Sequence, residues 1–153
     1  MTTPINRRAF VNSALATAFA AGLMKSRFVF AKDAFSGIDA VGQAALVREK
    51  KVTSLELVDA AIARIESGNP KVNAVVAEYF DKARKQAKTS LPASPLSGMP
   101  YLIKDLNDIK GEIATSGSRL MATHIGAENS LLAQKAIDAG MIVVGKTNIR
   151  NLD

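Results

Sequence analysis

The chain has 153 residues, of which 48% are hydrophobic and 22% charged, the profile of one globular domain or of the beginning of a larger one. It contains no cysteine, which excludes disulfides, thiolate metal sites and a cysteine nucleophile. Its single histidine, His124, makes a histidine metal cluster or a Ser-His-Asp triad hard to assemble, and we expect no metal site.

The net charge of +6 is concentrated near the N-terminus. Residues 1–31 hold four basic residues and no acidic one, and the 16 basic and 14 acidic residues that follow give a net charge of only +2. The later part of the chain also lacks a clustered basic face with interleaved aromatic residues, which a nucleic-acid surface requires. We therefore expect no nucleic-acid partner.

Residues 1–31 have the organisation of an export signal. The pair Arg7-Arg8 is basic, and the uncharged, alanine-rich residues 14–24 are too few for the roughly 20 that span a bilayer. The sequence Asn-Arg-Arg-Ala-Phe-Val resembles a bacterial twin-arginine signal. We expect it to engage the export machinery and to place the protein in the periplasm or outside the cell. The alternative is a first helix that stays on the protein.

Residues 36–91 are predicted to form a helical N-terminal region. Apolar residues at helical spacing predict one helix over residues 39–51. Thr53 and Glu56 then have the form of a capping box that opens a second helix. The sequence Gly-Asn-Pro at 68–70 is expected to stop this helix.

A β-branched segment at residues 72–77 predicts a short strand, and Phe80 opens a further helical pattern with a charged, solvated face. The serine- and proline-rich residues 89–96 form a loop and mark the best internal boundary.

Residues 95–153 are predicted to begin an α/β core. Residues 101–104 form a strand, residues 129–139 a helix with Asn129 as its cap, and residues 141–145 a second strand. The unbroken apolar run in the second strand is typical of parallel sheets buried on both faces, joined by a right-handed crossover. Because two such strands leave the sheet uncovered, we expect the front portion of a longer α/β protein, truncated before its core is complete.

The residues from Gly140 to Thr147 match the P-loop formula of nucleotide-binding proteins. A P-loop needs a strand before its first glycine and flexible residues inside it, whereas here a helix precedes and Met, Ile, Val and Val lie inside. We interpret this segment as a strand followed by a turn, and nucleotide binding is the remote alternative.

Lys104 is the residue best placed for chemistry. It ends a short apolar strand and precedes a loop rich in glycine, serine and threonine. We expect burial of that strand to desolvate its ammonium group, which lowers a lysine pKa and yields a neutral base. Asp105 and Asp108 could do acid-base work, but we favour a turn-shaping role, and a structural role for His124.

Three separated blocks resemble the amidase signature family of serine amide hydrolases. The first is Leu-Ser-Gly-Met-Pro-Tyr-Leu-Ile-Lys-Asp from residue 96, the second Ala-Thr-Ser-Gly-Ser from residue 114, and the third Ala-Gly-Met-Ile-Val-Val-Gly-Lys-Thr-Asn from residue 139. The sequence Val-Thr-Ser-Leu-Glu-Leu-Val-Asp from residue 52 resembles the helical lead-in of the same family. The resemblance implies a mixed sheet flanked by helices.

The resemblance also implies a Ser-Ser-Lys triad, in which Lys104 corresponds to the catalytic lysine. Thr115, Ser116, Gly117 and Ser118 would lie near the site as backbone support rather than as nucleophiles. Lys146 would be structural. The family's Gly-Ser-Ser-Gly segment, which supplies both serines and the oxyanion hole, is absent from these residues.

The expected activity is hydrolysis of a small-molecule or peptide-like amide to acid and amine, without metal or organic cofactor. Because only the lysine of the triad is present, we expect the chain to be inactive alone. The alternative from a different class is a non-catalytic truncated product, or a subunit that another chain completes.

Overall fold

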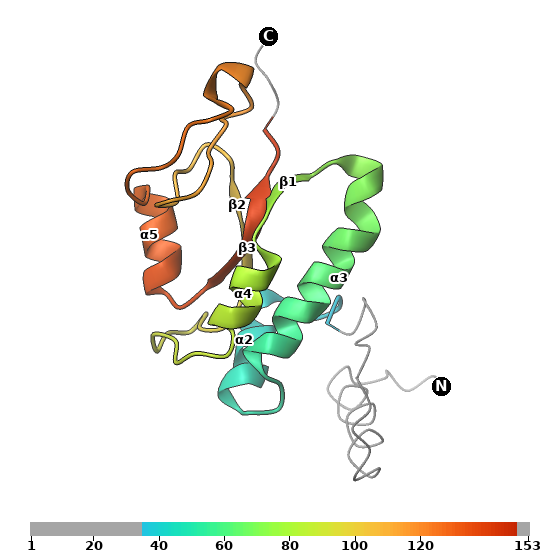
Figure 1. The fold of residues 1–153 in the computed structure, drawn as a ribbon. Helices are drawn as coiled ribbons and strands as arrows, with labels where there is room; N and C mark the ends of the chain where they lie inside the picture. The colour runs from blue at the N-terminus through green and yellow to red at the C-terminus, as the bar shows by residue number, and fades with distance from the viewer. Residues whose placement is uncertain (1–34, 150–153) are drawn as a thin grey trace, which may run out of the picture.

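The computed structural model describes residues 35–149 and shows a small mixed sheet between helices (Figure 1). The three strands lie in the order β1-β3-β2. β1 (Val75–Glu78) pairs antiparallel with β3 (Ile142–Thr147), and β3 pairs parallel with β2 (Pro100–Lys104). The predicted α/β fold with a mixed sheet is therefore confirmed. The expected export signal, residues 1–31, lies outside the described residues.

Helices cover both faces of the sheet. On one face α3 (Ser54–Val72) and α4 (Phe80–Gln86) pack on the strands, and on the other lies α5 (Leu131–Asp138) (Figure 1). The fully or nearly buried side chains of the first face are Val58, Ile62, Ala83, Ile142 and Val144, and those of the second are Ile103, Ile109 and Ala133.

The helix α2 (Ala40–Arg48) forms a separate small cluster with the start of α3. Phe35, Ala44, Leu57, Ala60 and Met99 are buried in it. The helix predicted over residues 39–51 is observed with Asp39 as its cap, but it ends earlier than predicted, at Arg48.

The helix α3 begins as predicted and ends later than predicted. Its capping box is present, with Thr53 Oγ1 accepting from Glu56 N at 3.2 Å and Glu56 Oε2 accepting from Thr53 N at 2.7 Å. The expected stop at Gly-Asn-Pro is wrong, because the helix continues through Pro70 to Val72.

The end of α3 is formed by two asparagines, Asn73 through its backbone and Asn69 through its side chain, rather than by the glycine or the proline. Asn73 adopts the left-handed conformation, with φ of 45°, and terminates the helix. The Asn69 amide donates to Val75 O and accepts from Val75 N, both at 2.8 Å, and so joins the last turn to β1. Pro70 lies close enough to the end for the loss of one N–H group to be tolerated.

The cap of α5 is Ser130, whose Oγ accepts from Ala133 N at 3.3 Å, and the prediction of Asn129 is wrong. Asn129 serves the preceding loop instead, because its Oδ1 accepts from Lys110 N at 2.8 Å. Both residue types cap helices well, so composition alone could not choose between them.

An irregularity in β3 sets the orientation of Lys146. Tyr101 pairs with Val143, but Leu102 pairs with Gly145, so Val144 has no partner in β2. Cross-strand partners share a face of the sheet. Lys146, which pairs with Ile103, is thereby turned to the α5 side.

The P-loop match is accidental, because the Gly-Lys-Thr sequence lies within β3 and Lys146 is fully buried. Of the helices in residues 35–149, none combines the length and the apolar character needed to cross a membrane.

Candidate active site

Lys104 is the last residue of β2, and its side chain is exposed. The expectation that burial of the strand would desolvate its ammonium group is wrong within the described residues. Successive side chains of a strand point to opposite faces, so Lys104 and Asp105 point apart. The result is one exposed and one buried charged group side by side in the sequence.

Asp105 lies at the centre of a buried polar cluster. It is 2% exposed, and its Oδ1 is 3.4 Å from Nζ of Lys146, which is 0% exposed. Lys146 Nζ also donates to Ile113 O at 2.8 Å. Buried charges require such partners, because an isolated buried charge is strongly unfavourable. Asp105 is thus a buried anchor, beyond the turn-shaping role expected for it.

Asp105 also attaches the loop of Thr115 to the end of β2. Its Oδ2 accepts from Thr115 Oγ1 at 2.6 Å and from Thr115 N at 3.2 Å. Asp105 N donates to Thr147 O at 3.1 Å, which continues the ladder between β2 and β3. The structure therefore brings the predicted loop to the strand end that carries Lys104.

The other loop residues have local backbone roles. Ser116 and Gly117 adopt positive φ, 48° and 67°, so the chain turns sharply there. Thr115 Oγ1 accepts from Gly117 N at 3.2 Å. Ser118 Oγ accepts from Leu120 N at 3.2 Å and caps a short 3-10 helix, η1 (Arg119–Met121). The capping role preferred for Ser118 over a nucleophilic one is observed.

Tyr79 borders this cluster from the start of α4. Within residues 35–149 its hydroxyl oxygen is buried and has no hydrogen-bond partner. Burial raises the pKa of Tyr79 to about 12, and the negative charges of Glu112 and Asp105 act in the same direction. The phenol is therefore neutral at physiological pH. Like Tyr101 and Val143, Tyr79 packs against the apolar cluster on the α5 side of the sheet.

His124 and Asp108 pair at the surface of the same loop region. Nε2 of His124 is 3.3 Å from both carboxylate oxygens of Asp108, and each side chain is a little over one third exposed. Backbone atoms of His124 also bond to Ala114 and Met121. His124 therefore holds this loop region together through both its backbone and its side chain. This is the structural role expected for His124. In residues 35–149 no group of three or more potential metal ligands occurs.

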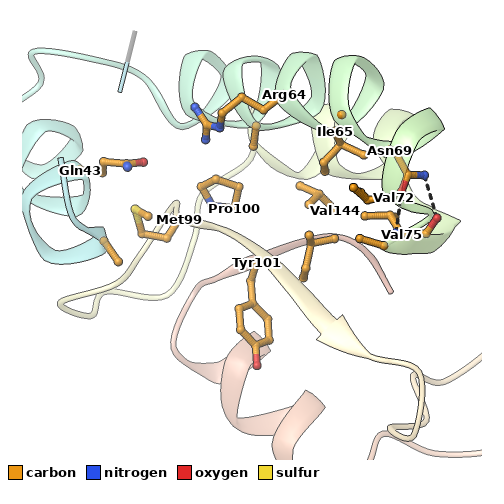
Figure 2. Close-up of a pocket in the computed structure, with 15 residues that line it drawn as sticks. Gln43, Arg64, Ile65, Asn69, Val72, Val75, Met99, Pro100, Tyr101 and Val144 are labelled. Atoms are coloured by element: carbon orange, nitrogen blue, oxygen red, sulfur yellow. Dashed lines mark hydrogen bonds between the residues drawn. The ribbon is translucent and has the colours of Figure 1, made fainter. Parts of the chain in front are cut away.

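A cavity of about 470 Å³ lies between α2, α3 and the sheet, and Lys104 is not among the residues that line it. Its wall is mostly apolar, with Ile65, Pro100 and Val144 facing each other, whereas the ring of Tyr101 extends toward α5 (Figure 2). The size suits a small ligand. Among the described residues that line the cavity there is no nucleophile or base, and the candidate chemistry lies at the end of β2.

The Asp105–Lys146 pair was not predicted from the sequence. A lysine within an apolar strand and an acid directly after the neighbouring strand do require partners, and parallel strands bring their carboxyl ends together. That signal could have connected the two residues. The sequence did not reveal the irregularity at Val144. Without it, the regular alternation of side chains along β3 would turn Lys146 to the face of the sheet that α3 covers.

The described residues thus form an α/β fold, a mixed sheet with helices on both faces, in which Lys104 ends a strand beside a small-residue loop. The family model of the amidases matches residues 56–152. The chain belongs to the amidase family.

Curated relatives agree with this assignment. The 6-aminohexanoate-cyclic-dimer hydrolase of Paenarthrobacter ureafaciens is 37% identical over 113 residues, which are 72% of this chain and 22% of the relative. The lipoamidase of Enterococcus faecalis is 36% identical over 126 residues, 81% of this chain and 17% of the relative. The chain thus spans about one fifth of the length of these relatives.

Solved structures show the same fold. The structure of 6-aminohexanoate cyclic dimer hydrolase complexed with substrate is 36% identical, with a TM-score of 0.66 over 72% of this chain and 23% of that one. A bacterial aryl acylamidase of the amidase signature family is 28% identical, with a TM-score of 0.65 over 72% of this chain and 25% of that one.

Proposed function

We propose that Lys104 is the proton acceptor of an amide hydrolase that works through a Ser-Ser-Lys triad. The observation that carries the proposal is the position of Lys104, at the carboxyl end of β2 and next to a buried aspartate that anchors the site loop. Membership of the amidase family supports the same reaction. Both serines of the triad come from outside these 153 residues, in which no Gly-Ser-Ser-Gly segment occurs.

In the proposed reaction the neutral amine of Lys104 takes a proton from a bridging serine, which takes the proton of the nucleophilic serine. The serine oxygen attacks the amide carbonyl, and the amine leaves with a proton returned through the same relay. Water then cleaves the acyl ester, so amide and water give acid and amine. The relay uses neither metal nor organic cofactor.

Lys104 must be uncharged to act in this way, and its present exposure keeps the ammonium hydrated. We propose that the family's Gly-Ser-Ser-Gly segment, called the serine segment below, covers Lys104 when it docks on the end of β2. Covering the side chain removes the ammonium from water, and desolvation favours the neutral amine. The chain alone is then inactive, and its substrate in the completed enzyme is a small-molecule or peptide-like amide.

Three preparations test the proposal: the 153-residue chain alone, the same chain mixed with a separately produced serine segment, and one polypeptide containing both. The substrates are acyl p-nitroanilides and simple primary amides. We expect hydrolysis by the single polypeptide and none by the chain alone. Activity of the mixture would show a subunit completed by another chain. Absence of amide hydrolysis in every preparation would refute the proposed function.

We also propose that residues 1–31 export the protein through the twin-arginine route. The paired arginines and the short alanine-rich segment support this. A fusion of residues 1–40 to a fluorescent reporter should reach the bacterial periplasm, and replacing Arg7 and Arg8 by lysine should retain it in the cytoplasm. Equal export of both fusions would contradict the proposal.

A further inference from the structure

The cluster of Asp105, Lys146 and Thr115 joins the end of β2, the strand β3 and the loop that follows β2. Asp105 directly follows β2, Lys146 lies in β3, and Thr115 lies in the loop that precedes η1. All three meet at one carboxylate, through contacts of 2.6 Å and 3.2 Å to Thr115 and 3.4 Å to Lys146. These contacts from two sides hold the Asp105 carboxylate in a single orientation.

That orientation fixes the backbone that carries Lys104. The Asp105 side chain is held from β3 and from the loop, and its backbone N–H is held by Thr147 O at 3.1 Å. Lys104 O accepts from Asn107 N at 3.0 Å and from Asn107 Nδ2 at 3.2 Å. The peptide between Lys104 and Asp105 is therefore restrained at both its C=O and its N–H, although the Lys104 side chain is exposed.

A base acts efficiently only when its nitrogen is held within hydrogen-bond distance of the proton it accepts. An exposed lysine side chain has several rotatable bonds, so the position of its Cα is the part that the fold can determine. Asp105 is buried at this strand end, and one of its two side-chain partners, Lys146, is fully buried as well.

We propose that Asp105 is a positioning residue for Lys104, and that buried Lys146 and the Thr115 hydroxyl hold the Asp105 carboxylate in place. This inference rests on the proposed function. Lys146 does not take part in the chemistry, because it is fully buried against Asp105 and Ile113 O. Its charge compensates that of Asp105, which could not otherwise be buried.

The test uses the polypeptide that contains both this chain and the serine segment. Asp105→Asn keeps the size of the side chain and removes its charge. We expect kcat for an acyl p-nitroanilide to fall at least 10-fold while KM changes less than 2-fold, since the substrate itself is not contacted. Glu112→Gln is the matched control: it is the same chemical change in a nearby, partly exposed ion pair with Lys82, and it should leave kcat unchanged.

Thr115 provides a second pair of variants in case Asp105→Asn does not fold. Thr115→Val keeps the shape of the side chain and removes the 2.6 Å bond to Asp105, so kcat should fall. Thr115→Ser retains a hydroxyl and should restore most of kcat. If Thr115 only stabilised the fold, both variants would change the thermal stability. Their kcat values would then not differ in this way.

Failure of the proposed function and failure of the positioning role of Asp105 give different results. If the wild-type polypeptide hydrolyses no amide, or if Lys104→Ala remains active, the proposed function is wrong. If Lys104→Ala is inactive while folded Asp105→Asn, or Thr115→Val, keeps kcat within 2-fold of wild type, the proposed function stands and the positioning role is refuted.

Discussion

Replacing Gly145 by alanine should destabilise the protein markedly. Gly145 lies in β3 opposite Glu78 of β1, and a Cβ atom on it would lie 2.4 Å from Ala77 O, where real Cβ atoms stay beyond 3.0 Å. Gly145 is not among the glycines with positive φ, so crowding alone sets the cost. The obstacle is backbone, which cannot rotate away, and β1 must therefore move from β3.

The magnitude follows from two contributions. Overpacking of a well-packed site costs about 1–3 kcal/mol. Weakening one hydrogen bond of the β1–β3 ladder adds about 1 kcal/mol. We expect the free energy of unfolding to fall by about 2–4 kcal/mol.

The assay is urea denaturation followed by far-ultraviolet circular dichroism. Gly68→Ala is the matched control, because Gly68 lies inside α3 with no atom within 4 Å of an added Cβ. The control should stabilise the protein by about 0.5–1 kcal/mol, as alanine is the better helix former. If Gly145→Ala instead costs less than about 0.5 kcal/mol, the strand environment deduced for the Gly-Lys-Thr sequence is wrong.

Two further changes test local features. Thr53→Ala removes the capping box of α3 and should lower the free energy of unfolding by about 0.5–2 kcal/mol, measured by the same denaturation. Tyr79→Phe removes a buried hydroxyl without a partner and should leave stability unchanged or increased, so a clear loss would reveal an unrecognised partner. The pKa of Tyr79, raised to about 12, predicts that stability falls as pH rises from about 10 to about 12. Above pH 10 the unfolded chain releases the phenolic proton that the folded chain retains, and Tyr79→Phe should remove this part of the pH dependence.

The order of the elements could be predicted from the sequence because local signals were strong. The capping box at Thr53 is a short-range pattern, and the unbroken apolar run in β3 is typical of a strand buried on both faces of a sheet. The position of Lys104 at the end of β2 followed from the same reasoning.

The remaining features depend on contacts between distant residues. Asn69 extends α3 past the expected stop by bonding to Val75, which no local propensity encodes. The unpaired Val144 turns Lys146 toward Asp105, so the buried pair emerges only from the register of β2 and β3. Exposure of Lys104 likewise depends on what covers the strand end, not on the strand itself.

The most direct test of the central claim is the amide hydrolysis rate of Lys104→Ala in the polypeptide that also contains the serine segment. Removing a proton acceptor should lower kcat by about 10²–10⁴-fold while circular dichroism and thermal unfolding remain as in wild type. Lys110→Ala, a change of another exposed lysine in the same region, is the control and should retain full activity. A Lys104→Ala protein that hydrolyses amides at the wild-type rate would contradict the assignment of Lys104 as the base.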